Sequence, residues 1–323
     1  MAPVEVAVSA ARPGRAPGIQ EHPRIAVSSV GGFVSWMDYR GNGDVYGTRL
    51  DREGRPLDPL GIRVSTTKLG PAGMTTFGDD YLIAVTTPCD AIGVVRVTSE
   101  GFVSPERSIG TSAGLCIASI SMASNGRTAL AAWPGGEAVL LGRDDEVLTR
   151  FPLGAVESVA VATNGTDYLI ATLTRTGPSI DLAVQRVSSA GEAGERYLFG
   201  GVGDIAAVTL ASNGTDYFVA ATGTSLRTQV ISGDGTPVGS PELVAIDRGT
   251  TAIDATWNGG EYIVLFPRFD SAAWKYSLVA ARYDVKGRRT ASEAVANVTQ
   301  NAPFPNFSLG SSSSAGSFGG SAP

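Results

Sequence analysis

The stretch Ala-Thr-Asn-Gly-Thr-Asp-Tyr-Leu-Ile-Ala, residues 162–171, recurs as Ala-Ser-Asn-Gly-Thr-Asp-Tyr-Phe-Val-Ala at residues 211–220. Four weaker copies align with it on one glycine, so the shared glycines are Gly31, Gly78, Gly126, Gly165, Gly214 and Gly259. Their spacings are 47, 48, 39, 49 and 45 residues, with a mean of about 46. Because a repeat of this length corresponds to one four-stranded blade, the pattern predicts an all-β, six-bladed β-propeller of antiparallel blades.

Each copy predicts four strands joined by short turns. The shared Asn-Gly lies between the first two strands, where we expect a two-residue hairpin turn because both residues tolerate positive φ. The third strand is clearest at residues 44–50, 91–97, 181–187 and 277–283. A second turn carries Gly54, Gly101, Gly191, Gly235 and Gly287 in five copies, whereas the third copy has Asp144-Asp145-Glu146.

The first strand of each copy has one small side chain followed by a mostly bulky one. The small column reads Ala26, Gly73, Ser121, Ala160, Thr209 and Asp254, and the next column reads Val27, Met74, Met122, Val161, Leu210 and Ala255. This alternation has the period of a strand with two different faces. It fits the innermost strand of a propeller, where blades crowd together, and Asp254 is the exception among the small residues.

The repeats divide the chain into blades at about residues 22–66, 67–112, 113–154, 155–202, 203–249 and 250–298. We expect residues 1–298 to form one propeller domain. Residues 3–10 resemble an outer strand, and since an unclosed ring exposes strand edges, we expect this N-terminal strand to close the ring. The Ser/Gly-rich segment 299–323 is expected to be a flexible tail or linker.

The composition argues against several function classes. The 323 residues carry a net charge of −6 and no basic run, which speaks against nucleic acid or an anionic membrane as a partner. No stretch of about 18 apolar residues is present, which argues against membrane insertion, and no signal-peptide pattern opens the sequence. One histidine and two cysteines exclude most zinc, haem and iron–sulfur sites, so we expect no cofactor and no metal.

The repeat resembles that of bacterial extracytoplasmic β-propeller proteins. In that family, Ala-x-Asn-Gly-x-x-Tyr-Leu-Val-x-Trp precedes an Asp-Ile-x-x-x-Arg-Val strand and a Gly turn, and the match covers residues 22–298. The Trp remains only as Trp36 and Trp133, and the Arg is clear as Arg49, Arg96, Arg186 and Arg282. The resemblance implies an adhesion, recognition or surface-structural module more often than an enzyme, by analogy of fold.

A propeller whose innermost strand comes first has two distinct faces. The connectors between blades and the loops between second and third strands share the connector face, and the tight Gly turns share the turn face. Aromatic side chains beside Arg and Asp can stack on a sugar or anchor a partner protein. On the connector face we therefore expect the ligand-binding candidates Tyr39, Arg40, Asp44, Arg175, Arg268, Asp270, Trp274 and Tyr276. The alternative is that Trp274 and Tyr276 begin a strand and pack between blades.

The two cysteines fall on the same face of neighbouring blades. Cys89 lies in a loop of the second copy, and Cys116 lies in the connector to the third copy. A disulfide between them is geometrically reasonable, and two separately buried thiols are the alternative. A disulfide would favour an oxidising compartment.

Carboxylates near the mouth of the ring keep an enzymatic alternative open. Glycosidases use two carboxylates about 5–10 Å apart. Asp38, Asp44, Asp90, Asp254 and Asp270 could lie near one mouth. The alternative is that Asp44 begins a strand and Asp38 lies in a solvated loop, so we assign no catalytic residue.

The sequence therefore predicts a non-enzymatic, extracytoplasmic recognition, adhesion or surface-assembly module. We expect it to bind a protein or a carbohydrate ligand through the connector face, and to be extracellular, at the cell surface or periplasmic. Self-assembly, or attachment to a larger chain through the C-terminal tail, is a further expectation. A carbohydrate-active hydrolase with a carboxylate pair at the propeller mouth is the alternative function.

Overall fold

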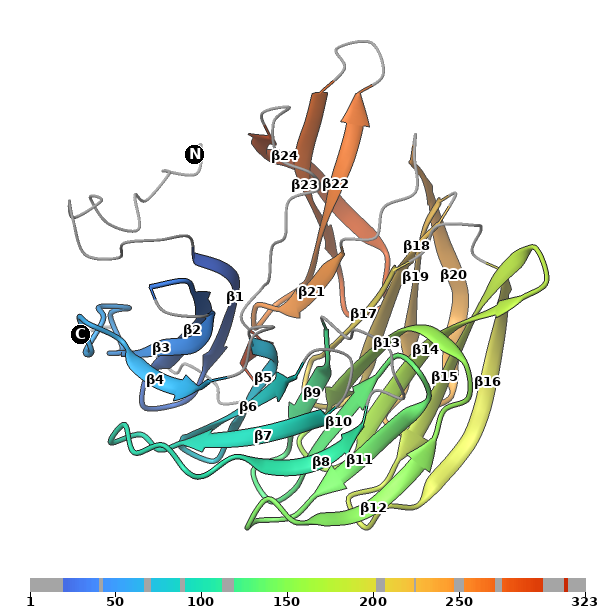
Figure 1. Ribbon diagram of the computed structural model, residues 1–323. Helices are drawn as coiled ribbons and strands as arrows, with labels where there is room; N and C mark the ends of the chain where they lie inside the picture. The colour runs from blue at the N-terminus through green and yellow to red at the C-terminus, as the bar shows by residue number, and fades with distance from the viewer. Residues whose placement is uncertain are drawn as a thin grey trace, which may run out of the picture.

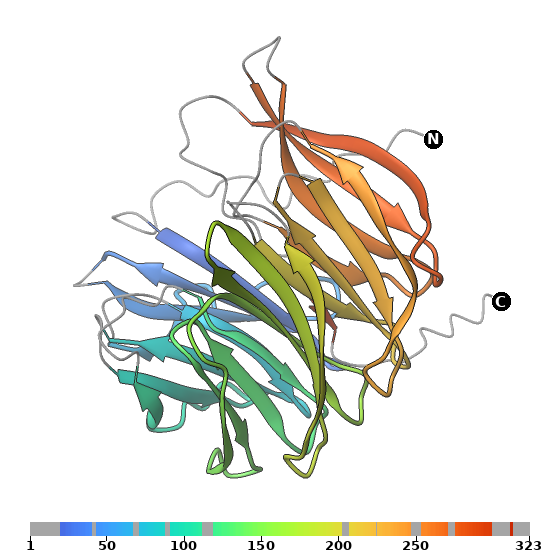
Figure 2. The same cartoon turned by 90° about the vertical axis from the view of Figure 1, so that its right-hand side faces the viewer.

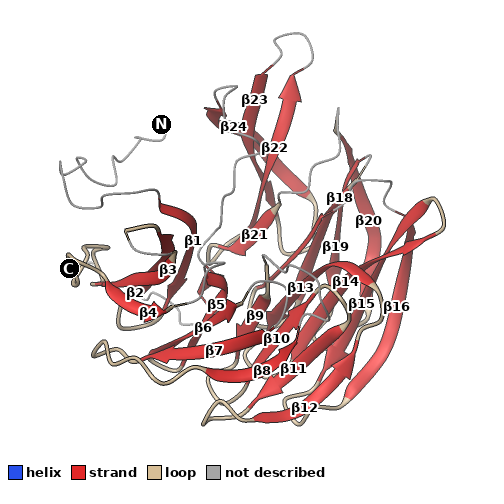
Figure 3. Cartoon of the chain, viewed as in Figure 1, coloured by secondary structure: helices blue, strands red, loops and turns tan. Residues whose placement is uncertain are grey.

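The structure, a computed structural model, describes residues 20–40, 43–66, 71–87, 91–111, 119–201, 207–223, 225–246, 253–270, 275–298 and 311–312. For residues 71, 269–270, 275–276, 296–298 and 311–312 only the backbone is described. Regular secondary structure in these ranges is entirely β-strand (Figure 3). No helix in the described part of the chain is long and apolar enough to cross a membrane.

Six four-stranded units make up the fold. Blade one comprises β1 (Gln20–Val27), β2 (Gly32–Asp38), β3 (Asp44–Leu50) and β4 (Ile62–Ser65). Blade two comprises β5 (Pro71–Phe77), β6 (Asp80–Thr86), β7 (Ala91–Val97) and β8 (Arg107–Thr111), and blade three β9 (Ser121–Ser124), β10 (Ala129–Trp133), β11 (Glu137–Leu141) and β12 (Val147–Pro152).

The second half of the chain repeats the same order. Blade four comprises β13 (Val156–Thr163), β14 (Tyr168–Thr176), β15 (Ser179–Val187) and β16 (Ala193–Gly201), and blade five β17 (Ala207–Ser212), β18 (Tyr217–Thr222), β19 (Ser225–Ile231) and β20 (Pro237–Ala245). Blade six comprises β21 (Asp254–Trp257), β22 (Tyr262–Asp270), β23 (Lys275–Tyr283) and β24 (Arg289–Val298).

The units are arranged as the blades of a propeller. Consecutive strands pair antiparallel within each sheet. From β1 to β21, the first strand of each blade packs beside the first strand of the next, and the sheets fan outward from this centre (Figures 1 and 2). The expected six-bladed, all-β propeller is confirmed.

Small residues on the first strands let neighbouring blades approach closely at the axis. A Cβ added to Gly73 would lie only 2.2 Å from the carbonyl oxygen of Ile120 in the next blade. One junction further, Ser121 Oγ accepts a hydrogen bond from the backbone N of Val161 at 2.8 Å. The small column of the sequence therefore marks backbone-to-backbone contact between blades.

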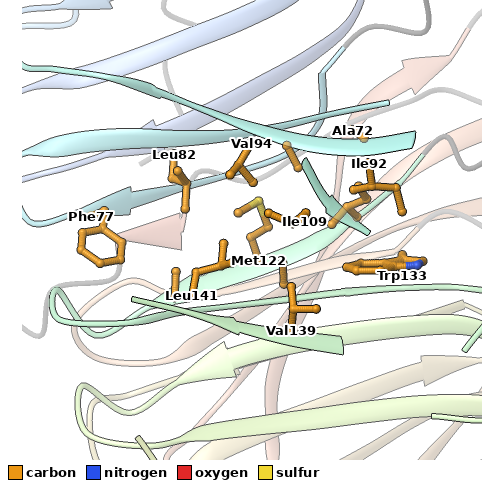
Figure 4. Close-up of a cluster of buried hydrophobic side chains, with 14 residues drawn as sticks. Ala72, Phe77, Leu82, Ile92, Val94, Ile109, Met122, Trp133, Val139 and Leu141 are labelled. Atoms are coloured by element: carbon orange, nitrogen blue, oxygen red, sulfur yellow. The ribbon is translucent and has the colours of Figure 1, made fainter. Parts of the chain in front are cut away.

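Apolar side chains fill the space between sheets further from the axis. Between blades two and three, Leu82 and Val94 of one sheet belong to the same buried cluster as Met122 and Val139 of the other (Figure 4). Trp133 at the end of β10 is also fully buried in this cluster. Burying a side chain of this kind contributes about 1.5–3 kcal/mol, so these clusters supply most of the cohesion between blades.

The Asn-Gly turn is longer than the expected two-residue hairpin. In blade four the loop comprises residues 164–167, and Asn164 Oδ1 accepts hydrogen bonds from the backbone N of Thr166 and Asp167 at 3.0 and 2.9 Å. Only Gly165 has a positive φ, at 89°. The same side-chain closure recurs in blades three, five and six. The expectation was wrong because asparagine closes the turn with its side-chain oxygen rather than with left-handed backbone.

In blades two and four, the tyrosine of the repeat joins its blade to the first turn of the preceding blade, whereas the buried hydroxyls of Tyr217 and Tyr262 in blades five and six have no partner among the described residues. The hydroxyl of Tyr168 donates to the carbonyl oxygen of Thr128 at 2.7 Å and lies 2.7 Å from the Thr128 hydroxyl. The Tyr81 hydroxyl lies 3.4 Å from Ser28 Oγ in the same way. Burial raises the pKa of Tyr168 to about 12, so this hydroxyl stays a donor at neutral pH.

The arginine of the third strand pairs with the acidic residue that precedes this tyrosine. The pairs are Arg96 with Asp80 (3.6 Å), Arg186 with Asp167, and Arg282 with Glu261 (2.6 Å). Cross-strand register explains the pairing, because each arginine stands opposite the residue after the tyrosine. Two columns that are far apart in the sequence of a repeat therefore form an ion pair within blades two, four and six.

Asp145 replaces the second-turn glycine in blade three. Its φ is 62°, in the left-handed region where the corresponding Gly101 of blade two lies at 93°. Aspartate is one of the few residues other than glycine that tolerate this region. Its carboxylate binds the guanidinium of Arg96 in the preceding blade, with Arg96 Nε 3.3 Å from Asp145 Oδ2. The departure from the repeat thus adds an ion pair between blades.

The junction between blades six and one differs from the other five. Blade one has Gly32 at the position of the repeat tyrosine. No described atom lies within 4 Å of a Cβ built at Gly54, whereas a Cβ at Gly235 would lie 2.9 Å from the side chain of Arg186 in the preceding blade. Asp254 on the inner strand of blade six attracts the guanidinium of Arg24 on β1, so an electrostatic interaction links the two ends of the ring.

The N-terminal closing strand predicted at residues 3–10 lies outside the described residues and stays a prediction. Within the segment 299–323, predicted as a flexible tail, Ser311–Ser312 form the short strand β25. This strand pairs in parallel with Ala26 and Val27 on the edge of β1 that β2 leaves open. Two serines carry no strand pattern, so the sequence held no signal for this pairing.

Replacing Gly73 by alanine should destabilise the ring by at least about 2 kcal/mol, because the new Cβ must push apart the backbones of two blades. Urea denaturation followed by circular dichroism measures the effect. Gly194→Ala is the matched control, since a Cβ there meets its nearest neighbour at an ordinary 3.5 Å. Equal stability of the two variants would contradict the close approach.

Replacing Tyr168 by phenylalanine should cost about 1 kcal/mol, because the hydrogen bond to Thr128 across two blades is lost while the ring stays buried. The same denaturation measurement tests it. Tyr197→Phe serves as the control, since that hydroxyl bonds only to exposed Glu195 and its loss should leave stability nearly unchanged. A Tyr168→Phe variant as stable as the wild type would speak against the role of this hydroxyl between blades.

Candidate functional site

The predicted ligand-binding residues lie in three different blades. Tyr39 and Arg40 follow β2, and Asp44 begins β3 of blade one. Arg175 lies near the end of β14 in blade four, which is on the opposite side of a six-bladed ring from blade one. Arg268 lies on β22 of blade six. The structure therefore distributes these side chains around the connector face and does not gather all of them at one point.

Several predicted residues fall where the structure is not described. Trp274, Cys89 and Cys116 lie outside the described residues, so the proposed disulfide stays a prediction. Asp270 ends β22 and Tyr276 lies on β23, and only their backbone is described. The backbones of Asp270 and Tyr276 thus belong to paired strands, and the position of Tyr276 near the start of β23 agrees with the alternative that it begins a strand.

Arg40 is held in place by a buried carboxylate. Its guanidinium Nη2 lies 2.6 Å from Asp38 Oδ2, and the Asp38 side chain is 0% exposed. Asp38 also accepts hydrogen bonds from Trp36 Nε1 at 3.0 Å and from the backbone N of Arg40 at 2.9 Å. The hydrogen bond from the Arg40 side chain lowers the pKa of Asp38 to about 2, and the one from Trp36 adds to it. Arg40 is therefore fixed against the end of β2.

Two further candidates already have ionic partners within the chain. Asp44 Oδ2 lies 3.9 Å from Arg63 Nη1. Arg175 Nη2 donates to Glu157 Oε2 at 3.0 Å, and both side chains are exposed. Exposed pairs of this kind contribute little to stability, so a negatively charged ligand group can replace Glu157 as the partner of Arg175.

Tyr39 and Arg268 are the accessible candidates. Tyr39 is 42% exposed, and its hydroxyl donates to Glu21 Oε2 at 3.3 Å. Arg268 is exposed and forms no ion pair or hydrogen bond with any described residue. It lies on the hairpin of β22 and β23, which projects beyond the neighbouring blades (Figure 1). Arg268 is thus an exposed cation on the connector face that has no partner among the described residues.

Asp38 does not have the environment of a glycosidase acid. A general acid needs a raised pKa, whereas the pKa of Asp38 is lowered. Asp254 accepts a hydrogen bond from Thr209 Oγ1 at 3.4 Å and faces Arg24. Asp90 lies outside the described residues. Among the residues that the structure describes, no three His, Cys, Asp or Glu side chains could hold a metal ion together.

A cavity lies on the propeller axis at the opposite, turn face. Its volume is about 90 Å³, and it is lined by the ends of the inner strands of blades two to six and by the first turns of blades four and five. Because five blades contribute, the cavity must lie where the inner strands converge. Its lining includes the side chains of Thr75, Met122, Leu210, Thr256 and Trp257.

The sequence contained one overlooked signal for this cavity. The residue before the Asn-Gly turn is Ser124, Thr163 or Ser212 in three blades, and its hydroxyl donates to the carbonyl of the turn at 2.8–2.9 Å. Blade six has Trp257 there, half-buried against Tyr262 with ring centroids 4.8 Å apart. A bulky aromatic in a column of small hydroxyl residues points to the rim of a site.

Comparisons with known proteins show the fold. Neither protein families nor curated protein sequences give a match. Among solved structures, the chain is similar to the Dos1 propeller, with 12% identity, a TM-score of 0.53, and coverage of 82% of this chain and 68% of that chain. It is also similar to a "putative 6-phosphogluconolactonase" from Bacteroides fragilis, with 14% identity, a TM-score of 0.51, and coverage of 84% and 81%. The chain is a β-propeller repeat protein.

Replacing Asp38 by asparagine should cost about 2 kcal/mol at pH 7, because the buried ionic hydrogen bonds to Arg40 are weakened. Since the folded pKa of Asp38, about 2, is below the unfolded value of about 3.9, its contribution is present above the unfolded pKa and is lost as pH falls through the folded one. The stability difference between wild type and variant should therefore shrink from pH 5 to about pH 2.

Urea denaturation at a series of pH values measures this difference. Exposed Asp144 provides the control, since its side chain makes no contact with a described residue. Asp144→Asn should leave the free energy of unfolding unchanged across the series. A difference that stays constant down to pH 2 would show that Asp38 does not act as a charged group.

Proposed function

We propose that this chain is a non-enzymatic, extracytoplasmic recognition or adhesion module that binds a protein or glycan ligand through its connector face. The observation that carries the proposal is exposed Arg268 on the projecting β22–β23 hairpin. It has no partner among the described residues, in a chain of net charge −6. An exposed cation without a partner among the described residues is suited to an acidic group of a ligand.

The connector-face residues of blade one support the same function. Tyr39 is exposed next to Arg40, and the ion pair with Asp38 holds the Arg40 side chain in place. A side chain that is ordered before binding loses little conformational entropy when the ligand arrives, which favours affinity. Exposed tyrosine combines apolar area with a hydrogen-bonding hydroxyl, a combination enriched at binding sites.

A catalytic role is less well supported by the same face. The alternative, a carbohydrate-active hydrolase, needs one carboxyl with a raised pKa beside a second carboxylate. The direction of the Asp38 shift is the opposite, and Asp44 is near Arg63. We therefore propose binding without chemistry at this surface, and the extracytoplasmic location rests on the resemblance of the repeat.

Replacing Arg268 by glutamate should abolish or strongly weaken ligand binding, because it places a negative charge where an acidic ligand group would bind. Binding is measured on a glycan array with acidic and neutral glycans and on a peptide array with acidic and neutral peptides. Arg127→Glu is the matched control, since Arg127 is equally exposed but lies on a turn-face loop.

The expected result is selective binding of acidic probes by wild type and by Arg127→Glu, weakened by added salt, and none by Arg268→Glu. Equal binding by all three proteins would exclude Arg268 as a ligand contact. Lack of any binding by folded wild type on both arrays would contradict the proposed function.

A further inference from the structure

The axial cavity on the turn face has an uncharged lining of mixed polarity. Met122 and Leu210 supply apolar surface, and Thr75, Thr256 and Trp257 supply hydroxyl and indole N–H groups. Among the residues that the structure describes, no Asp, Glu, Lys, Arg or His side chain lines it. A charged ligand group would lose its hydration without gaining an ionic partner, so the cavity suits a neutral group.

Three of these polar groups have no partner within the described part of the chain. Thr75 is only 6% exposed, yet its hydroxyl makes no hydrogen bond there. The hydroxyl of Thr256 and the Nε1–H of Trp257 also make none. None of the three is among the buried unpartnered polar atoms of the described residues, so these groups are accessible from the cavity rather than enclosed in the core. The cavity thus offers donors and acceptors to a ligand that the fold itself does not use.

The size of the cavity limits what can enter. The cavity is small, with a volume of about 90 Å³, and it opens to solvent. It therefore suits a small substituent of a ligand whose remaining part lies at the rim. An acetamido group has this size, a methyl for the apolar lining, a carbonyl that accepts a hydrogen bond and an N–H that donates one.

Trp257 provides the surface on which the rest of such a ligand would lie. Its indole is half-buried at the rim, and Tyr262 packs against it and fixes its orientation. An aromatic ring held in place presents a large rigid area at low entropic cost, which suits the flat apolar side of a pyranose. Polar groups below it and an aromatic platform beside it are thus combined in one site.

We propose that this cavity is a second binding site, which takes an N-acetylated amino sugar of a neutral glycan. The acetamido group enters the cavity and makes one hydrogen bond with the hydroxyl of Thr75 and one with the hydroxyl of Thr256, one through its carbonyl oxygen and one through its N–H, and the pyranose ring lies on Trp257. The site is on the face opposite Arg268 and does not depend on the connector face.

The test uses the full chain with two trisaccharide probes, the β1,4-linked trimer of N-acetylglucosamine and the β1,4-linked trimer of glucose, which lacks only the acetamido groups. Calorimetric titration measures affinity. Thr75→Val and Thr256→Val remove one hydroxyl each at nearly constant shape. Each should weaken binding of the acetylated trimer about fivefold, the loss of one hydrogen bond, without lowering thermal stability.

Two further variants complete the design. Trp257→Ala should weaken binding at least tenfold, and the valine variants keep the test decisive if this one destabilises the fold. Thr174→Val is the matched control, because the Thr174 hydroxyl is also buried without a partner but lies on β14 outside the cavity lining. It should leave affinity unchanged.

The proposal predicts that wild type binds the acetylated trimer and not the glucose trimer, and that Arg268→Glu binds it normally. No binding of either trimer by folded wild type, equal binding of both, or undiminished binding by both Thr75→Val and Thr256→Val would overturn it. Because Arg268 is not involved, failure here and failure of the connector-face proposal are distinguishable.

Discussion

The close approach of adjacent inner strands is the constraint on which the rest of the structure depends. Where Gly73 lies against the carbonyl oxygen of Ile120, there is no room for a side chain, so the two blades are in backbone contact at the axis. This contact sets the distance between sheets further out, and the apolar clusters fill that distance. A ring built in this way is stiff at its centre and leaves its variable groups at the two faces.

The columns of the repeat are best understood as contacts across blades or across strands. The asparagine closes its own turn in blades three to six, and the tyrosine bonds the preceding turn in blades two and four. The acidic residue before the tyrosine pairs with the third-strand arginine in blades two, four and six. These roles hold the turn face in shape, so that a single departure such as Trp257 can produce a site on its rim. Among the described residues of the connector face no such repeated bonding is present.

The sequence predicted where the connector-face candidates lie, but not which of them already have an ionic partner within the chain. Tyr39, Arg40 and Asp44 were expected in or beside one loop, and they are found there. Whether an arginine is free or committed depends on which carboxylate the fold brings near it, and sequence alone does not show this. Arg40 is committed to a neighbour two residues away, whereas the partner of Arg175 is 18 residues away on another strand. The cavity was missed because its lining comes from five blades, and no local pattern contains it.

The sequence by itself determined the number of blades, the order of strands and the division into two faces. Each of these follows from periodicity: a glycine every 46 residues or so, a small column in the first strand, and alternating apolar residues. Only the tertiary structure decided that Asp145 pairs with Arg96, 49 residues away, and that Asp254 attracts Arg24 across the ends of the ring. It alone also decided which polar groups stay without partners, because hydrogen bonding between distant repeats depends on distances of a few tenths of an ångström that residue spacing does not specify.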